Sequence, residues 1–399
     1  MNVLMMAISS YDFDPRIIRL SSALIEKNIC VDLICLRYGR QSEHETLNGV
    51  HVHRIMKNFH HDSILSYAFY SLIFIIKAMI KSLVISSKRK PDLVHVNNMP
   101  DHLVFTTIIQ KLRGVPIILD FHDLTVELFK EKWSEKKFKQ YKSILKFVEK
   151  LSCNFANQLM TVTKECVDIL VSRGNKPEKV TLIMNSTDEK VFRYDDSRFK
   201  MNGTNRFNIL YHGTIAKRFG LHYFINAMPE IVKVIPYAEF HLFGNISNNE
   251  YTDELRKLID NAGLTNKVFL SDPVPYAEVN NMIKNYDLGV VTYERTEYMN
   301  LALPTKACEY AFTGLPFIIS DLISVRSVFS DKSVCYVDPE NTAYISEIVL
   351  DLYNTPKKRK ELSKNALADI NKISWGVMKK RYIDLIYHLT KSDKYFFSL

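Results

Sequence analysis

The first strand of the fold is expected at the start of the chain, where Asn2-Val-Leu-Met-Met-Ala-Ile8 forms a continuous apolar run. Such a run is typical of a parallel strand that is buried on both faces of its sheet. A polar turn follows, after which Pro15 can open a helix, because proline suits the first turn. Residues 31–36 are again apolar and predict a second strand. This strand–helix–strand order favours a parallel α/β sheet.

The same alternation continues to the end of the chain, with one interruption by an irregular polar stretch at residues 195–205. We therefore expect two Rossmann-like, doubly wound parallel sheets that face each other across a cleft. They would comprise residues 1–195 and 206–375, with a C-terminal helix at 376–399 that packs back on the first domain. Further strands are expected at residues 93–96, 116–120, 207–211, 238–243, 268–270, 288–292, 316–320 and 334–337. One helix is expected to end at residue 86, and two more are expected at residues 101–113 and 219–234.

Composition limits the class of protein. The chain has 399 residues, of which 47% are hydrophobic and 24% charged, so it can build two apolar cores and is not a disordered or fibrous chain. Its six cysteines show no paired spacing, which argues against a zinc site or a redox dithiol and fits a reducing cytoplasm. No secretion signal is recognisable at the N-terminus. The net charge is +9.

Two segments raise the question of membrane contact. Residues 64–76 carry no charge, but the run is shorter than the roughly 20 residues of a membrane span, so we expect a well-buried helix. The alternative is a helix whose apolar face lies in a membrane interface. Residues 129–150 hold eight lysines and three glutamates, and Phe138, Tyr141, Leu145 and Val148 recur on one helical face. Either that face packs on its own domain, or the segment binds an anionic membrane surface, which would place the protein on the inner face of the cell membrane.

Ligands of doubly wound sheets bind at the carboxyl ends of the strands, so the loops that follow the strands are expected to form the ligand site. After the strand at 207–211 comes His-Gly-Thr-Ile-Ala-Lys-Arg-Phe-Gly-Leu, residues 212–221. Gly213 permits a close backbone approach, and Lys217 and Arg218 precede a helix. Helix amides together with an arginine can bind a diphosphate. The alternative is a pair of solvated basic side chains in a loop.

A second such loop is found at residues 301–320. Pro304 or Thr305 should begin a short helix and Gly314 should end it. Glu309 then lies about one turn into the helix, where its carboxylate could bind the vicinal hydroxyls of a ribose. The alternative is a solvated charge on the helix surface.

The first half of the chain offers two candidate loops. Residues 120–127 place His122, Asp123 and Glu127 just after a strand, and residues 12–16 form the turn after the first strand. This turn lacks G-x-G-x-x-G, so binding of NAD or FAD there is not expected. The chain also has no P-loop lysine motif, H-E-x-x-H or G-x-S-x-G, which leaves ATPase, zincin and α/β-hydrolase functions without support.

These segments together resemble the retaining glycosyltransferases of family 4, which have the GT-B fold, and the resemblance runs over essentially the whole chain. The first domain would then be the acceptor side and the second the donor side. The matching segments are Asp14-Pro-Arg16, Asn97-Asn-Met-Pro-Asp101, residues 119–128, Met184-Asn-Ser-Thr-Asp188 with Phe192, His212-Gly-Thr with Arg218-Phe-Gly-Leu221, and Leu303-Pro-Thr-Lys with Glu309-Tyr310.

The resemblance implies a role for each matching residue. Arg218 and Lys306 would neutralise the donor diphosphate, Glu309 would bind the nucleotide ribose, and His122 would contact the donor sugar. The donor site would further include Gly213, Thr214, Gly244, Leu303, Pro304 and Thr305, and the acceptor side Asp14, Arg16, Asn98, Asp123 and Glu127. The chain departs from the family where Leu301 replaces a frequent glutamate, where Ser9-Ser10 replace a glycine pair, and where Thr214 replaces an arginine.

The implied reaction is retaining transfer of a sugar from a nucleotide-diphosphate donor to a glycan or polyprenyl-linked acceptor. Cell-surface polysaccharide synthesis (O-antigen, capsule or exopolysaccharide) is the expected setting. No cofactor and no metal are expected, because no D-x-D motif lies near a donor loop. A GT-B sugar-nucleotide epimerase is the alternative enzyme, and a phosphorylase would need a much larger chain. Nucleic-acid binding is permitted by the +9 charge but lacks any recognition motif, so it is not expected.

Overall fold

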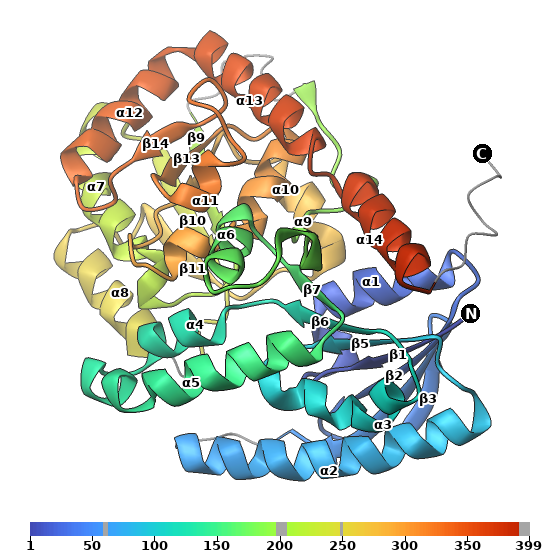
Figure 1. Ribbon diagram of the computed structural model, residues 1–399. Coiled ribbons are helices and arrows are strands. Elements are labelled where there is room, and N and C mark those ends of the chain that lie inside the picture. Colours follow the sequence, from blue (N-terminus) through green and yellow to red (C-terminus); the bar gives the residue numbers. More distant parts are fainter. Residues whose placement is uncertain (59–62, 197–205, 248–249, 391–399) are drawn as a thin grey trace. The chain divides into compact units, whose positions relative to one another are not determined.

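The computed structural model describes residues 1–58, 63–196, 206–247 and 250–390 (Figure 1). The chain divides into two compact units. Unit 1 comprises Met1–Met184 together with Met378–Leu399, and unit 2 comprises Asn185–Val377. The chain thus passes into unit 2 at Asn185, and most of the expected linker, residues 197–205, lies outside the described residues.

Unit 1 is built on an eight-stranded sheet of order β3-β4-β2-β1-β5-β6-β7-β8. All neighbouring strands are parallel except β3 and β4, so the predicted doubly wound parallel sheet is confirmed. The strands are β1 (Asn2–Met6), β2 (Cys30–Arg37), β3 (His44–Leu47), β4 (Val50–Lys57), β5 (Leu93–Asn97), β6 (Ile117–Phe121), β7 (Gln158–Thr161) and β8 (Val180–Leu182).

The antiparallel hairpin β3–β4 was not expected from the sequence. Its turn is Asn48-Gly49, with φ values of 51° and 83°. Asparagine and glycine tolerate this left-handed backbone, and the pair is a strong hairpin signal. The hairpin is short and its strands alternate between exposed and buried side chains, so they show no continuous apolar run.

Helices cover both faces of the sheet of unit 1 (Figure 1). α1 (Pro15–Ile25) begins as expected at Pro15, and the Asp14 side chain accepts hydrogen bonds from the backbone N–H groups of Arg16 and Ile17. α14 (Trp375–Thr390) joins the same unit through Tyr382, whose hydroxyl lies 2.9 Å from Nδ1 of His95. The remaining helices of this unit are α2 (Ile64–Lys88), η2 (Asp101–Thr107), α3 (Ile108–Leu112), α4 (Thr125–Lys132), α5 (Glu135–Phe155), α6 (Lys164–Ser172) and the short η1 (Tyr11–Phe13) and η3 (Pro177–Lys179).

Helix α2 differs from the expected well-buried helix. It has 25 residues, because the apolar pattern continues past Lys77 and Lys81. Within it, residues Ser66–Lys88 are long and apolar enough to cross a membrane by length and composition alone, and 28% of the tested window is buried. One face packs inward through Phe74, Ala78 and Ile85, whereas much of the rest is exposed. The expectation of general burial was therefore wrong.

Helix α5 orients the predicted apolar face inward. Phe138 is buried, and Tyr141, Leu145 and Val148 are partly buried, whereas the lysines of the helix are exposed. For these four side chains, the structure favours packing on their own unit.

Unit 2 contains a six-stranded, all-parallel sheet of order β11-β10-β9-β12-β13-β14, as expected for a Rossmann-like domain. Alternate residues of β9 enter two separate cores, with Ile209 and Tyr211 in one and Leu210 in the other. The strands are β9 (Phe207–His212), β10 (Ala238–Phe243), β11 (Val268–Ser271), β12 (Leu288–Val291), β13 (Phe317–Ser320) and β14 (Cys335–Val337).

Helices and glycines then shape the strand ends of unit 2. α10 (Thr305–Thr313) begins and ends where the sequence predicts, and Gly314 follows it with a φ of 77°. The other helices are η5 (Lys217–Phe219), α7 (Leu221–Val234), α8 (Glu250–Asn261), α9 (Tyr276–Ile283), η6 (Met299–Leu301), α11 (Ile323–Arg326), α12 (Thr342–Asn354) and α13 (Pro356–Asn371).

Candidate functional site

Two glycines allow the loops after β9 and β10 to approach each other closely. Gly213 has a φ of 119°, and its N–H donates to the carbonyl of Phe243 at 2.8 Å. A Cβ atom on Gly244 would lie 2.3 Å from the carbonyl oxygen of Gly213. The two loops therefore pack backbone against backbone at Gly244, which cannot be replaced without moving the loop of Gly213, and Gly213 itself has a backbone conformation that favours glycine.

Lys306 lies beside Gly213 in the first turn of α10. A Cβ atom on Gly213 would stand only 3.4 Å from its Nζ. The ammonium group donates a hydrogen bond of 2.6 Å to the hydroxyl of Tyr293. It also stands over the rings of Tyr211, Phe219 and Tyr293, at 4.8, 5.3 and 4.8 Å from their centroids. The lysine is 6% exposed, so aromatic faces replace most of its water.

The charge of Lys306 is not neutralised by a neighbouring acid. No carboxylate of the described residues lies within 4.0 Å of its Nζ, although Glu309 acts on it from farther away. Burial lowers the pKa of Lys306 to about 8, and Glu309 opposes the shift. The side chain is still mostly charged near neutral pH, and a buried charge without an adjacent counter-ion favours an anionic ligand.

Arg218 supplies a second cation to the same aromatic group. Its guanidinium carbon stands 4.9 Å from the ring centroid of Phe219, the ring that also faces Lys306. Within the described residues Arg218 makes no ion pair. Gly220 fixes this loop, because a Cβ atom there would lie 1.8 Å from the carbonyl oxygen of Thr292. α7 begins directly after Gly220.

The remaining predicted donor residues lie around these cations. Glu309 is 8% exposed, and its Oε2 is 3.1 Å from Nε2 of His212. Thr214 and Thr305 are exposed, Leu303 is half-buried, and Pro304 precedes α10 without providing a side-chain cap. The backbone amides at the start of α10 thus have no side-chain acceptor, which suits a bound anion.

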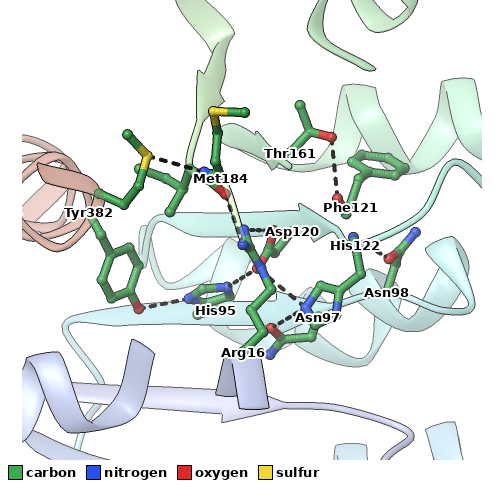
Figure 2. A network of polar contacts seen from close by, with 12 residues as sticks. Arg16, His95, Asn97, Asn98, Asp120, Phe121, His122, Thr161, Met184 and Tyr382 are labelled. Atoms are coloured by element: carbon green, nitrogen blue, oxygen red, sulfur yellow. Dashed lines mark hydrogen bonds and ion pairs between the residues drawn. The ribbon is translucent and has the colours of Figure 1, made fainter. Parts of the chain in front are cut away.

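In unit 1, the strand ends hold a buried polar network (Figure 2). Nε and Nη2 of Arg16 each donate to a different carboxylate oxygen of Asp120 at 2.8 Å, and Nη1 donates to the carbonyl of Ile183 at 2.8 Å. Arg16 is 4% exposed. Arg16 therefore holds Asp120 and the carbonyl of Ile183 in place, and its predicted role on the acceptor side stays a prediction.

His122 lies at the edge of this network. Its backbone N–H donates to Oδ1 of Asn98 at 2.9 Å, and its Nε2 lies 3.2 Å from Oδ1 of Asn97 and 3.5 Å from Oδ2 of Asp120. Burial would raise the pKa of the Asp120 carboxyl, but the Arg16 charge and the bonds of His122 and His95 hold it well below its usual range. The ionised carboxylate of Asp120 therefore orients the His122 ring. The side chain of His122 is 19% exposed.

Three other predicted acceptor residues have structural partners. Asp14 caps α1, as described above. The amide nitrogen of Asn98 donates to Oδ1 of Asp101 at 3.0 Å and to the carbonyl of Asp123 at 2.7 Å, which shapes the loop before α4. Glu127 pairs with Arg173 and has one buried oxygen without a hydrogen-bond partner. These contacts hold the loops in place, and the acceptor-side roles of these residues stay predictions. Asp123 is half-buried in the loop before α4.

Several residues of these sites were missed by sequence reasoning. Tyr293 follows the strand at 288–292, and this position at a strand end was the available signal. Tyr211 and Phe219 looked like ordinary core residues. His95 and Asp120 lie inside apolar strands, where one charged residue gives no indication of its partner.

Comparison with known proteins identifies the class. Residues 16–191 match Glycosyltransferase Family 4, and residues 194–369 match Glycosyl transferases group 1. The chain belongs to the family 4 glycosyltransferases, and its two units have the GT-B fold. The resemblance seen in the sequence is thereby confirmed.

Individual relatives are distant in sequence but similar over the full length. An uncharacterized glycosyltransferase of Methanocaldococcus jannaschii, MJ1607, is 23% identical over 95% of this chain and 97% of its own. Sucrose-phosphate synthase from Thermosynechococcus elongatus is 16% identical, with a TM-score of 0.78 over 98% of this chain and 100% of its own. HepE of Anabaena in complex with UDP-glucose is 14% identical, with a TM-score of 0.71 over 97% of this chain and 100% of its own.

Proposed function

We propose that this glycosyltransferase moves a sugar from a nucleoside-diphosphate donor to a glycan or polyprenyl-linked acceptor with retention at the anomeric carbon, as a step in cell-surface polysaccharide synthesis. The observation that carries the proposal is the buried ammonium group of Lys306, which has no carboxylate within 4.0 Å in the described part of unit 2. A diphosphate supplies the missing anion. Family membership and the predicted motifs around Gly213 and α10 support the same assignment.

The cations then act where charge develops. When the glycosidic C–O bond to the diphosphate breaks, its electron pair stays on the leaving oxygen, and the sugar carbon becomes oxocarbenium-like. Lys306, Arg218 and the amides at the start of α10 stabilise the negative charge that develops on the departing diphosphate, because they are fixed in place before the reaction. The acceptor hydroxyl attacks the same face of the sugar, and its proton passes to the departing phosphate oxygen.

Glu309 is proposed to bind the ribose of the donor. Its carboxylate lies one turn after the start of α10, close to the proposed diphosphate site, and its present neighbour is His212. Two ribose hydroxyls can replace the contact of a single imidazole nitrogen. A uridine nucleotide is the first choice of base, since HepE was solved with UDP-glucose. The first unit would supply recognition of the acceptor, and a contact between His122 and the donor sugar stays a prediction.

Thermal unfolding with a panel of nucleotide sugars tests the proposal. A ligand that binds only the folded state raises the melting temperature, so UDP-, GDP-, ADP- and TDP-sugars can be ranked by their shifts. We expect one diphosphate series to stabilise the wild type and to leave the Lys306→Met variant unshifted. Equal melting temperatures with every nucleotide would contradict a donor site in unit 2.

Product analysis separates the transferase from the alternative epimerase. The proposed reaction releases a nucleoside diphosphate in proportion to added acceptor, and the anomeric configuration of the linkage matches that of the donor. An epimerase would instead convert the nucleotide sugar into its epimer with no acceptor present.

A further inference from the structure

The large apolar side chains exposed on unit 1 are concentrated on three helices. Among the described residues of unit 1, Phe13 and Tyr38 are the only exposed large apolar side chains that lie outside these three helices. The three-helix surface, as we name it, consists of Phe69, Leu72, Ile76, Ile80 and Val84 on α2, Ile108 and Leu112 on α3, and Ile144, Phe147 and Leu151 on α5. Their exposed fractions run from 42% for Leu151 to 82% for Leu112. Soluble proteins seldom leave so many apolar side chains together in water.

The three helices lie in one layer. α2 and α5 both pack against η2, which continues directly into α3, and Figure 1 shows all of them on the same side of the sheet. The spacing of the exposed residues on α2 follows the helical repeat, so they form one stripe along the outer side of the helix. The stripe is opposite the inner face that contains Phe74 and Ala78, so packing inside unit 1 does not explain it.

The charges around this surface are of one sign. α2 contains three lysines and no acidic residue. α5 contains six lysines and two glutamates, and neither glutamate is a free negative charge. Glu135 pairs with Lys139 at 2.8 Å, and Glu149 is buried and pairs with Arg173 at 2.6 Å. An apolar stripe with basic margins is complementary to a lipid bilayer, in which hydrocarbon lies beneath anionic head groups.

A basic hollow borders the α2 end of the surface. It has a volume of about 420 Å³ and is lined by Lys81, Lys88 and Arg89, along with Val84 from the apolar stripe. Two acids also line it, and both are paired: the oxygens of Asp32 face His53 at 2.8 Å and Arg89 at 3.4 Å, and Glu45 pairs with Arg54. The hollow therefore extends the positive margin at the level where head groups would lie.

The inner side of α2 argues against a role as a membrane span. The side-chain nitrogen of Gln110 donates to the hydroxyls of Ser82 and Ser86, both at 3.2 Å, and Gln110 is 1% exposed. Removing α2 from unit 1 would leave these groups unpaired and uncover Phe74 and Ala78. The helix is thus suited to lie flat against a bilayer while it remains part of the fold.

We propose that the three-helix surface binds an anionic lipid bilayer, with the exposed side chains of α2, α3 and α5 inserted at the level of the head groups and the flanking lysines on lipid phosphates. The occupant is lipid and not a second copy of the chain, because the basic margins of two copies would repel each other. This proposal does not depend on the glycosyl-transfer reaction, since none of its residues belongs to the donor site.

Vesicle flotation with the full chain tests the proposal. Wild-type protein should float with vesicles of phosphatidylcholine and phosphatidylglycerol, should stay behind with phosphatidylcholine alone, and should bind less at high salt. The variant Ile80→Glu/Phe147→Glu places charges on residues that are 57% and 59% exposed, so the fold should tolerate it. Its partition onto anionic vesicles should fall by about tenfold or more.

A matched variant controls for the added charge. Val234→Glu/Ile323→Glu changes residues of unit 2 that are 56% and 61% exposed. It should float like the wild type, and both variants should keep the wild-type melting temperature. Equal flotation of the two variants would overturn the proposal, as would a wild type that never floats.

Two further results would also overturn the membrane-binding proposal: one would indicate self-association, and the other would indicate that α2 crosses the membrane. Light scattering that shows a dimer in the wild type and a monomer in Ile80→Glu/Phe147→Glu would assign the surface to self-association. Resistance of the bound protein to an alkaline carbonate wash would mean that α2 spans the bilayer.

Discussion

The ammonium group of Lys306 lies among three aromatic rings and donates to the hydroxyl of one of them, with no carboxylate of the described residues within 4.0 Å. Burial of a charge without a counter-ion destabilises the folded protein. The same charge gives an anionic ligand a strong electrostatic partner. Stability and donor binding should therefore respond in opposite directions to any change at this position.

Replacing Lys306 by methionine should stabilise the protein and abolish donor binding. The shift of the pKa from 10.5 to about 8 corresponds to a penalty of about 3 kcal/mol at neutral pH, part of which is offset by the lost bond to Tyr293. We expect the free energy of unfolding to rise by about 1–2 kcal/mol in a denaturant titration. Lys233→Met, at an exposed lysine of α7, is the control and should change neither property. A destabilised Lys306→Met variant would contradict the predicted penalty.

The pH dependence at Lys306 has a definite sign. A lysine whose pKa is lower in the folded state binds fewer protons when folded, so its penalty is complete below about pH 8. The penalty disappears as the pH rises from about 8 to 10.5, and unfolding free energy should rise over that window. Diphosphate binding needs the charged form, so affinity should fall by about tenfold per pH unit above 8. Calorimetric titrations of nucleotide at several pH values check this, and a pH-independent affinity would refute it.

Arg218 and Glu309 should each be required for turnover. Alanine at either position removes a group that we place on the leaving diphosphate or on the ribose, so the initial rate should fall at least about tenfold. Circular dichroism should show an unchanged fold. Arg256→Ala, which removes an equal charge from the surface of α8, should keep the wild-type rate. Near wild-type activity in either site variant would remove that residue from the site.

At the scale of single elements, the ends of helices hold both the fold and the sites in place. α10 presents uncapped amides where an anion is proposed to bind, whereas α1 is capped by the carboxylate of Asp14 and fixed by the buried pair of Arg16 and Asp120. One helix start thus remains open to a ligand, while the other is closed by the protein itself.

The cap of α1 should be measurable on its own. Asp14→Ala removes both bonds to the first turn and should lower the free energy of unfolding by about 1 kcal/mol. Asp14→Asn keeps an acceptor oxygen and should lose only a fraction of that value. If Asp14→Ala unfolds at the same denaturant concentration as wild type but loses acceptor binding, the cap would be unimportant and the acceptor contact predicted from the sequence would be supported.

At the scale of the whole molecule, continuous apolar runs predicted most parallel strands of both sheets, because strands buried on both faces need no alternation. The short parallel strands β7 and β8 were not predicted. The hairpin β3–β4 was missed, since its side chains alternate between exposed and buried. The outer face of α2 was missed for the opposite reason: a helix that is apolar on all sides gives no sign of which side packs.

The candidate site could be predicted in part. The loops with Gly213, Arg218 and Lys306 follow from the rule about strand ends and from the family motifs. The surroundings of Lys306 could not be foreseen, because Tyr211 lies on β9 and Tyr293 follows β12, far from Lys306 in the sequence. The pairing of Arg16 with Asp120 joins residues 104 positions apart, and no local pattern encodes it.

Activity of the intact protein should survive excess EDTA. In the proposed reaction, Lys306, Arg218 and the start of α10 supply the positive charge that a divalent ion would otherwise provide to the leaving group. Initial rates with and without EDTA should agree within about twofold. Loss of activity in EDTA and recovery with manganese would show that these cations do not suffice.

The unpaired ammonium group of Lys306 also bears on the pace of repeated turnover. The nucleoside diphosphate left after transfer carries one more negative charge than the nucleotide sugar, so the same fixed cation holds the spent donor more tightly than the fresh one. Under the proposed function, a site that stabilises the departing anion is thus slow to release it. The enzyme would be inhibited by its own by-product, and its working rate in the cell would follow the removal of that nucleotide more closely than the supply of activated sugar.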